Sequence, residues 1–138
     1  MPITINGSGT VTGITAGGLP DGVITTDDIA ANAVTFAKIG TTEQGQLCKA
    51  WVNFNGTGTV AIRASYNVSS ITDTAVGRYT VNYGTALTDA NYSLVATTNA
   101  DTRVVSISSL TTSGGAIRAT NTAGALEDQS EICVAIFR

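Results

Sequence analysis

From residue 47 onward, apolar and polar residues alternate in short runs that are separated by turn-forming residues. If the first run, LCKAWVNF at 47–54, forms a strand, every second side chain lies on the same face. The face with the smaller and more apolar residues comprises Cys48, Ala50, Val52 and Phe54. The opposite face comprises Lys49, Trp51 and Asn53. The pattern therefore predicts a strand that buries one face.

More runs of this kind follow, at spacings of roughly 8–12 residues that are typical of antiparallel sandwiches and barrels. Turn-forming clusters, such as NGTGT at 55–59, separate them. The further expected strands are 59–66, 67–73, 77–83, 92–98, 103–110, 116–121 and 131–137. We therefore expect an all-β fold, with an antiparallel β-sandwich-like head domain at residues 47–138.

Two of these runs allow more specific expectations. Residues 74–77 predict a hairpin in which Ile71 faces the side of the next strand that carries Tyr79, Val81 and Tyr83. The last run, EICVAIF, is almost continuously apolar. This composition predicts a strand in the middle of a sheet or one that packs against a neighbouring subunit.

Residues 1–46 have a different pattern, in which single aliphatic residues lie between Gly, Thr and Ser. A ten-residue phrase also occurs twice, because ITTDDI at 24–29 returns as VTFAKI at 34–39. We interpret each copy as an extended segment followed by one helical turn, capped by Thr25 or Thr35. The alternative is one continuous helix over 22–40, with acidic residues near its start and Lys38 near its end.

The repeat is too poor in large apolar residues to fold alone. Ordering the backbone costs about 1–2 kcal/mol per residue, whereas burying two aliphatic side chains contributes only about 3–6 kcal/mol. Identical copies stacked around a symmetry axis would supply the missing contacts. We therefore expect residues 1–46 to form an extended, intertwined arm for attachment and oligomerisation in a homotrimer. The expected contact residues are Ile24, Ile29, Val34, Phe36 and Ile39.

Composition limits the partners of this chain. Only 12% of the 138 residues are charged, the net charge is −3, and the seven basic residues are scattered singly. Binding of nucleic acid needs clustered Lys and Arg, so we expect no nucleic-acid partner. Residues 1–13 lack the features of a leader peptide, and no run approaches about 18 apolar residues. We expect no membrane insertion, and folding in the cytoplasm where the chain is made.

The residue types that carry catalysis are scarce. The chain has no histidine, which excludes Ser/His and Cys/His nucleophiles and removes the commonest metal ligand. The acidic residues fall mostly in expected turns, where capping and solvation explain them. We therefore expect no enzymatic activity, no cofactor and no metal site. Cys48 and Cys133 are expected to be buried free thiols, with a disulfide between the first and last strands as the alternative.

Five aromatic residues are candidates for contact with a receptor or with another subunit, because amphipathic rings dominate interface energetics. They are Trp51, Tyr66, Tyr79, Tyr83 and Tyr92. For each of them, packing in the core or between subunits is the alternative. Trp51 is the strongest candidate, because the alternation places it on the more polar face of its strand.

Three stretches together resemble short tail-fibre and related tail proteins of tailed bacteriophages, particularly those of cyanobacteria and other aquatic bacteria. They are PDGVITTDDIAANAVTFAKIG, CKAWVNFNGTGTVAIRASYNVSSITD and GRYTVNY. The resemblance covers about residues 20–95. The WVNF to NVSSITD part is fairly specific, whereas the decamer is common to many fibre-like proteins.

The resemblance implies a homotrimeric structural protein of the virion that attaches through its N-terminus. Its β-rich head would touch the host surface, through a glycan or a protein, and its other partners would be tail or baseplate proteins. The chain has no long shaft, which favours a short fibre. The alternatives are a head fibre or capsid decoration protein and a baseplate or collar protein. A polysaccharide-degrading enzyme that uses paired acids ranks third.

Overall fold

The computed structural model describes residues 24–138, so residues 1–23 of the expected arm lie outside the described residues. The chain divides into two units, Met1–Ile39 and Gly40–Arg138. The second unit includes the short helix α1 (Thr41–Gln46) as well as all the strands. This division lies closer to the N-terminus than the boundary after residue 46 that we expected from the sequence.

The described part of the first unit contains two short 3-10 turns, η1 (Thr26–Asp28) and η2 (Phe36–Lys38). The amide of Asp28 donates to the Thr25 carbonyl at 3.2 Å, and the amide of Lys38 donates to the Thr35 carbonyl at 2.8 Å. The two copies of the decamer thus form the same local structure ten residues apart, which confirms the repeat interpretation for these residues. The alternative of one continuous helix is wrong here, because Asn32 has a left-handed backbone (φ 64°) between the two turns.

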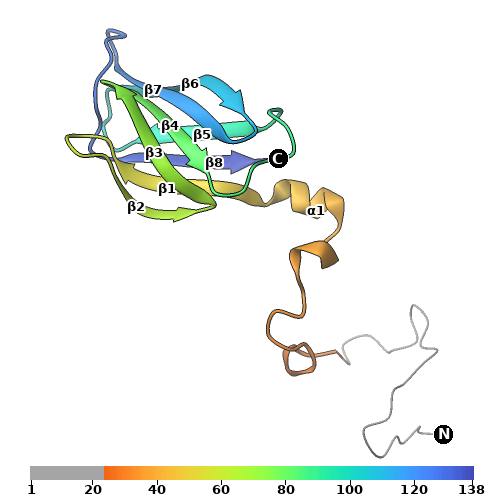
Figure 1. Cartoon of the computed structure of the whole chain (residues 1–138). Helices are drawn as coiled ribbons and strands as arrows, with labels where there is room; N and C mark the ends of the chain where they lie inside the picture. The colour runs from red at the N-terminus through yellow and green to blue at the C-terminus, as the bar shows by residue number, and fades with distance from the viewer. Residues whose placement is uncertain (1–23) are drawn as a thin grey trace, which may run out of the picture. The chain divides into compact units, whose positions relative to one another are not determined.

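The second unit is an antiparallel sandwich of two four-stranded sheets (Figure 1). Sheet A has the order β2-β1-β8-β5, and sheet B has the order β3-β4-β7-β6. The strands are β1 (Cys48–Asn55), β2 (Ala61–Tyr66), β3 (Val68–Ala75), β4 (Arg78–Tyr83), β5 (Ser93–Thr98), β6 (Arg103–Thr111), β7 (Gly114–Asn121) and β8 (Ile132–Phe137). The all-β expectation is confirmed, and every expected strand is present.

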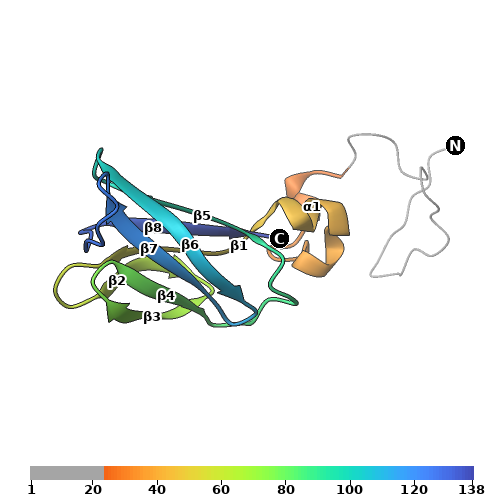
Figure 2. The ribbon, with the colours of Figure 1, turned by 90° about the horizontal axis from the view of Figure 1, so that it is seen from above.

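The hydrophobic core lies between the two sheets, which form the two layers of the head in Figure 2. Alternate residues of β1 and β8 supply it from sheet A, and alternate residues of β4 and β7 supply it from sheet B. The largest fully buried side chains are Tyr79, Phe54, Ile117, Ile132, Ile136, Val52 and Val81. Ile71 pairs with Val81 across the β3–β4 hairpin, as the sequence predicted. The final strand, β8, lies between β1 and β5, which confirms its predicted central position.

One strand begins earlier than its sequence suggested. Gly114 and Gly115 were expected to belong to a turn, but they are buried residues of β7. A side chain at Gly115 would come within 2.6 Å of Leu94 Cδ1 and 3.1 Å of the Tyr83 hydroxyl. The glycine therefore allows sheet A and a core tyrosine to approach the backbone of sheet B.

The two cysteines are free thiols, so the disulfide alternative is wrong. Although β1 and β8 are neighbours, Cys48 pairs with Phe137, whereas Cys133 pairs with Asn53 near the other end of β1. Four residues of strand separate the two pairs by about 13 Å, too far for a disulfide. Both thiols are only partly buried, which corrects the expectation that they are buried.

Candidate functional site

The most unusual surface of the head is the outer face of sheet A. Strand pairing places four residues in one row across the sheet, because Trp51 pairs with Tyr66 and Ala135, and Ala135 pairs with Val95. We call Tyr66, Trp51, Ala135 and Val95 the apolar row. Trp51 lies between the buried residues Ala50 and Val52 on β1, so its side chain faces outward. Residues paired directly across an antiparallel ladder share a face, so the whole row faces outward.

The apolar row leaves large apolar groups in contact with solvent. The exposed fractions are 59% for Tyr66, 40% for Trp51 and 57% for Val95. Single exposed apolar residues are common on protein surfaces, but a contiguous group of them marks an interaction site. The apolar row is such a group, since its members lie on adjacent strands.

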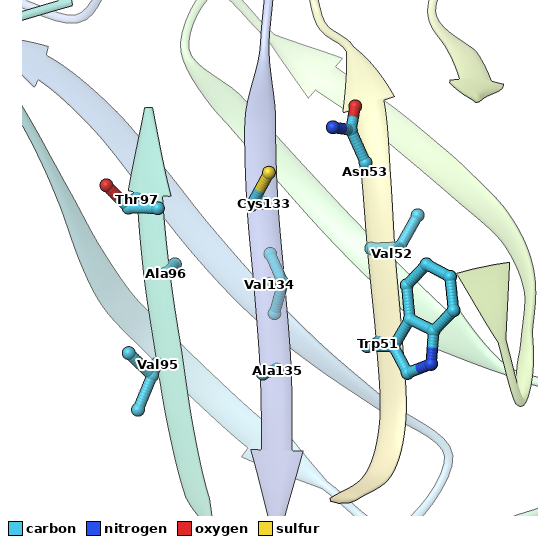
Figure 3. Close-up of a pocket in the computed structure, with 9 residues that line it drawn as sticks. All are labelled: Trp51, Val52, Asn53, Val95, Ala96, Thr97, Cys133, Val134 and Ala135. Atoms are coloured by element: carbon cyan, nitrogen blue, oxygen red, sulfur yellow. The ribbon is translucent and has the colours of Figure 1, made fainter. Parts of the chain in front are cut away.

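A groove runs along the middle of this face, with a volume of about 350 Å³. Figure 3 shows β8 in the centre, with β5 on one side and β1 on the other. The small residues Cys133 and Ala135 form its floor, because β8 carries no larger side chain on this face between residues 132 and 136. Its flanks carry Val95 and Thr97 on β5 and Trp51 and Asn53 on β1. We call this depression the sheet A groove.

Polar groups gather at one end of the groove. Asn53 Nδ2 donates to Glu131 Oε1 at 2.8 Å, and Arg63 lies 3.9 Å from the same carboxylate. Arg63 also donates to Asn53 Oδ1 at 3.3 Å and to the Ser130 carbonyl at 2.6 Å. A β-bulge explains its direction, since Ile62 pairs with Phe54 and Ala64 pairs with Asn53, leaving Arg63 without a partner on β1. The charges of Arg63 and Glu131 therefore offset one another at the end of the groove.

The Cys133 thiol is the titratable group in the floor of the groove. Burial raises the pKa of this thiol above its ordinary value, the Glu131 carboxylate raises it further, and Arg63 opposes the rise. A raised pKa lowers the thiolate fraction at neutral pH, so Cys133 is a weak nucleophile in this setting. Its position in the floor makes Cys133 a useful probe of the groove.

The structure separates the five aromatic candidates into two groups. Trp51 and Tyr66 belong to the apolar row, but Tyr79, Tyr83 and Tyr92 are buried core residues. The expectation of a receptor or interface role is therefore wrong for these three residues, which pack in the core. Tyr79 packs edge-on against Phe54, with ring centroids 5.3 Å apart, and its hydroxyl donates to Asp128 Oδ1 at 2.7 Å. The hydroxyls of Tyr83 and Tyr92 bond to one another at 2.9 Å inside the sandwich.

The expected oligomerisation residues lie in the first unit. Ile24, Ile29 and Val34 are exposed, and Ile39 is partly buried. The backbone of Phe36 belongs to η2, but its side chain lies outside the described part of the chain. The described members of this group therefore include three exposed aliphatic residues, and no residue of 24–40 whose side chain is described is buried.

Sequence reasoning missed the groove residues Val95, Cys133 and Ala135. The alternation within 92–98 and 131–137 already placed these side chains opposite the buried ones. The missing information was that β8 lies between β1 and β5, which are distant from one another in the sequence.

No protein-family model matches the chain, and no curated protein or solved structure is significantly similar to it. Over residues 24–138, no group of three or more His, Cys, Asp or Glu side chains is placed to hold a metal ion. No helix in the described part of the chain has the length and apolar character needed to cross a membrane. The arrangement of the apolar row and the groove is suited to contact with another molecule.

Proposed function

We propose that this chain is a structural virion protein of a tailed bacteriophage, a short trimeric fibre. Residues 1–46 attach it to the particle and associate with the same segment of other copies. Residues 47–138 form the β-sandwich head that is presented to the host surface. Several heads on one particle bind together, so that weak contacts add through effective concentration.

The observation that carries this proposal is the exposed, regularly spaced repeat. Its two copies form matching turns, and Ile24, Ile29 and Val34 are exposed. Ordering such a segment costs more free energy than its own contacts return. Association with identical copies would bury these aliphatic residues and stabilise the arm. The sequence resemblance to phage fibre proteins supports the same function.

Light scattering on the purified full chain tests the oligomer. We expect three times the chain mass of 14.0 kDa. Val34→Asp should shift the protein toward monomer, because it places a charge in the expected contact between arms. Val76→Asp is a matched control, since the two valines are exposed to similar extents, 61% and 57%. A monomeric wild-type chain would contradict the fibre proposal, and equal behaviour of the two variants would exclude the repeat as the oligomerisation device.

Incorporation into particles tests the attachment end and the location. A chain that lacks residues 1–40 should not join virions, whereas Val76→Asp should join them normally. If the shortened chain still incorporates, the attachment site lies in the head. Antibody labelling of intact particles then distinguishes a tail fibre from a head fibre, capsid decoration or collar protein.

A further inference from the structure

The two outer faces of the head differ in charge. The outward residues in the central rows of sheet A are the apolar row and the adjacent row Ala64, Asn53, Cys133 and Thr97. Neither row contains an Asp, Glu, Lys or Arg. On the outer face of sheet B, Arg78 pairs directly with Arg118 across β4 and β7. Neither arginine forms an ion pair with another residue in 24–138.

This difference decides which face can point toward the three-fold axis of the proposed trimer, where the same face of each copy comes together. Two sheet B faces brought together would oppose four arginines, and like charges at an interface cost several kcal/mol. The central rows of two sheet A faces would bring together uncharged groups, because the charged residues of this face, Lys49 and the offsetting pair Arg63 and Glu131, lie outside those rows. The aromatic residues Trp51 and Tyr66 are also of the types that supply most binding energy at interfaces.

The same face carries both a hollow and a projection. Cys133 and Ala135 leave the groove floor low, whereas Tyr66, at the end of the apolar row, is well exposed and does not line the groove. A large side chain from one copy can enter the groove of another. Such a match of shape is what a contact between identical subunits requires.

The size of the face favours another copy of this chain over a foreign protein as the partner. Strands about 4.8 Å apart, rising about 3.4 Å per residue, give four strands of six residues a face on the order of 400 Å². A stable independent interface buries about 800 Å² on each partner. A foreign protein would have to bind through a footprint of this size unaided, whereas the arms bring the heads of other copies together at high effective concentration.

We propose that the outer face of sheet A, centred on the groove, is the contact between the heads of neighbouring copies. This inference rests on the proposed trimer and assigns a surface to it. Trp51 and Tyr66 are the anchoring residues, and the floor at Cys133 receives the partner's side chain. The outer face of sheet B then remains accessible.

Cys133 allows a direct test in the full chain. In a Cys48→Ala background, the rate of maleimide labelling of Cys133 is measured in the assembled protein and in its Val34→Asp form, at one pH. The two forms have identical heads, so the ratio of the rates reports protection by assembly. We expect labelling at least about tenfold slower in the assembled protein, because a thiol reacts only when it is accessible.

Two further variants locate the contact. Tyr66→Gln should reduce the protection several-fold while the arms keep the oligomer together, and it does not alter the lining of the groove. Ser106→Gln, an exposed position on the outer face of sheet B, should leave the protection unchanged. Circular dichroism of each variant establishes that the head is folded. If Tyr66→Gln does not fold, Val95→Gln replaces it; because Val95 lines the groove, its labelling rate is compared with that of Val95→Gln in the Val34→Asp background.

The outcomes separate this inference from the proposed function. An assembled protein in which Cys133 is labelled as fast as in the monomer keeps the trimer and overturns the sheet A contact. Protection that appears only after host glycan or host protein is added also overturns it, because the occupant is then a ligand. A chain that is monomeric by light scattering contradicts both proposals. If Val34→Asp remains assembled, the comparison of wild type with Tyr66→Gln decides, and equal labelling overturns the contact.

Discussion

Sheet A and sheet B have inner faces of similar character and outer faces that differ. Both inner faces supply buried apolar residues at every second position, such as Phe54 on β1 and Ile117 on β7. The outer face of sheet B carries mostly hydroxyl, amide and guanidinium groups, with Val104 on β6 as an exposed apolar residue. Asn82 on this face donates to Ser70 Oγ at 3.0 Å and to Thr72 Oγ1 at 2.8 Å. The outer face of sheet A carries the apolar row.

This difference shows that folding alone does not account for both outer faces. An antiparallel sheet that needs only to fold places apolar residues inward and polar residues outward, as sheet B does at most positions. Exposed Trp51, Tyr66 and Val95 add nothing to the buried core, and they increase the risk of nonspecific association. The proposed contact between heads would explain their presence on one face.

The largest expected effect tests the similarity of the two inner faces. Phe54→Ala should lower the free energy of unfolding by about 3–5 kcal/mol and Ile117→Ala by about 2–5 kcal/mol, because each leaves a cavity in a packed core. Urea denaturation of the full chain measures both. Val76→Ala, at an exposed position, should change the value by no more than about 0.5 kcal/mol. A small loss at only one of the two core positions would show that the sheets contribute unequally to the core.

A second prediction concerns Tyr79 and Tyr83, the ionisable groups that β4 of sheet B brings into the core. Burial raises the pKa of Tyr79 and of Tyr83 far above the ordinary value of 10.0, and their hydrogen bonds to Asp128 and Tyr92 respectively add to the rise. Above pH 10.0 the unfolded chain releases these protons while the folded chain retains them. Below pH 10.0 the two phenols therefore do not change the free energy of unfolding. Above it, the free energy of unfolding falls as the pH rises.

Urea denaturation at a series of pH values between about 8 and 11 measures this fall. Each of the two tyrosines contributes up to about 1.4 kcal/mol per pH unit in the alkaline range. Tyr83→Phe should make the slope of unfolding free energy against pH less steep, because one of the two titrating groups is removed. Phe54→Leu is a control in sheet A, since it changes a neighbouring core side chain that has no proton to lose. Equal slopes in wild type and Tyr83→Phe would mean that the Tyr83 phenol titrates outside the core.

Much of this fold could be predicted from the sequence, because the strands alternate with a period of two and Gly-rich turns separate them. The pairing of Ile71 with Val81 also followed from the sequence, since a short hairpin links adjacent strands. The start of β7 could not be predicted in this way. Gly114 and Gly115 have the composition of a turn, and only the close approach of Leu94 and Tyr83 explains why they lie in a buried strand.

The candidate site was predicted only in part. Alternation placed Trp51 outward, and the same rule applied to β4 would have placed Tyr79 and Tyr83 beside Val81 in the core. The groove depended on the order of β1, β8 and β5, which are joined by long-range pairing. A pattern of period two gives the face of each side chain but does not show which strands are neighbours.

The smallest expected effect concerns the arginine pair on the outer face of sheet B. Arg78 and Arg118 lie directly opposite one another, and like charges in this position destabilise a sheet by a few tenths of a kcal/mol. Arg118→Gln should therefore raise the free energy of unfolding slightly at low salt. Arg138→Gln removes the same charge but breaks an ion pair with Asp89, so it should not raise stability. Urea denaturation in low salt measures both variants.

The salt dependence of the Arg118→Gln effect distinguishes charge repulsion between the two arginines from the packing of their aliphatic stems. At an ionic strength of about 1 M the Debye length falls to about 3 Å, so repulsion between exposed charges is screened. The stability gained by Arg118→Gln should disappear under these conditions, whereas an effect of stem packing would persist. A variant that is less stable than wild type at every salt concentration would show that the Arg118 stem stabilises sheet B. The charge difference between the two outer faces would then result from packing within sheet B, and it would no longer argue that sheet A is the face that points toward the axis of the trimer.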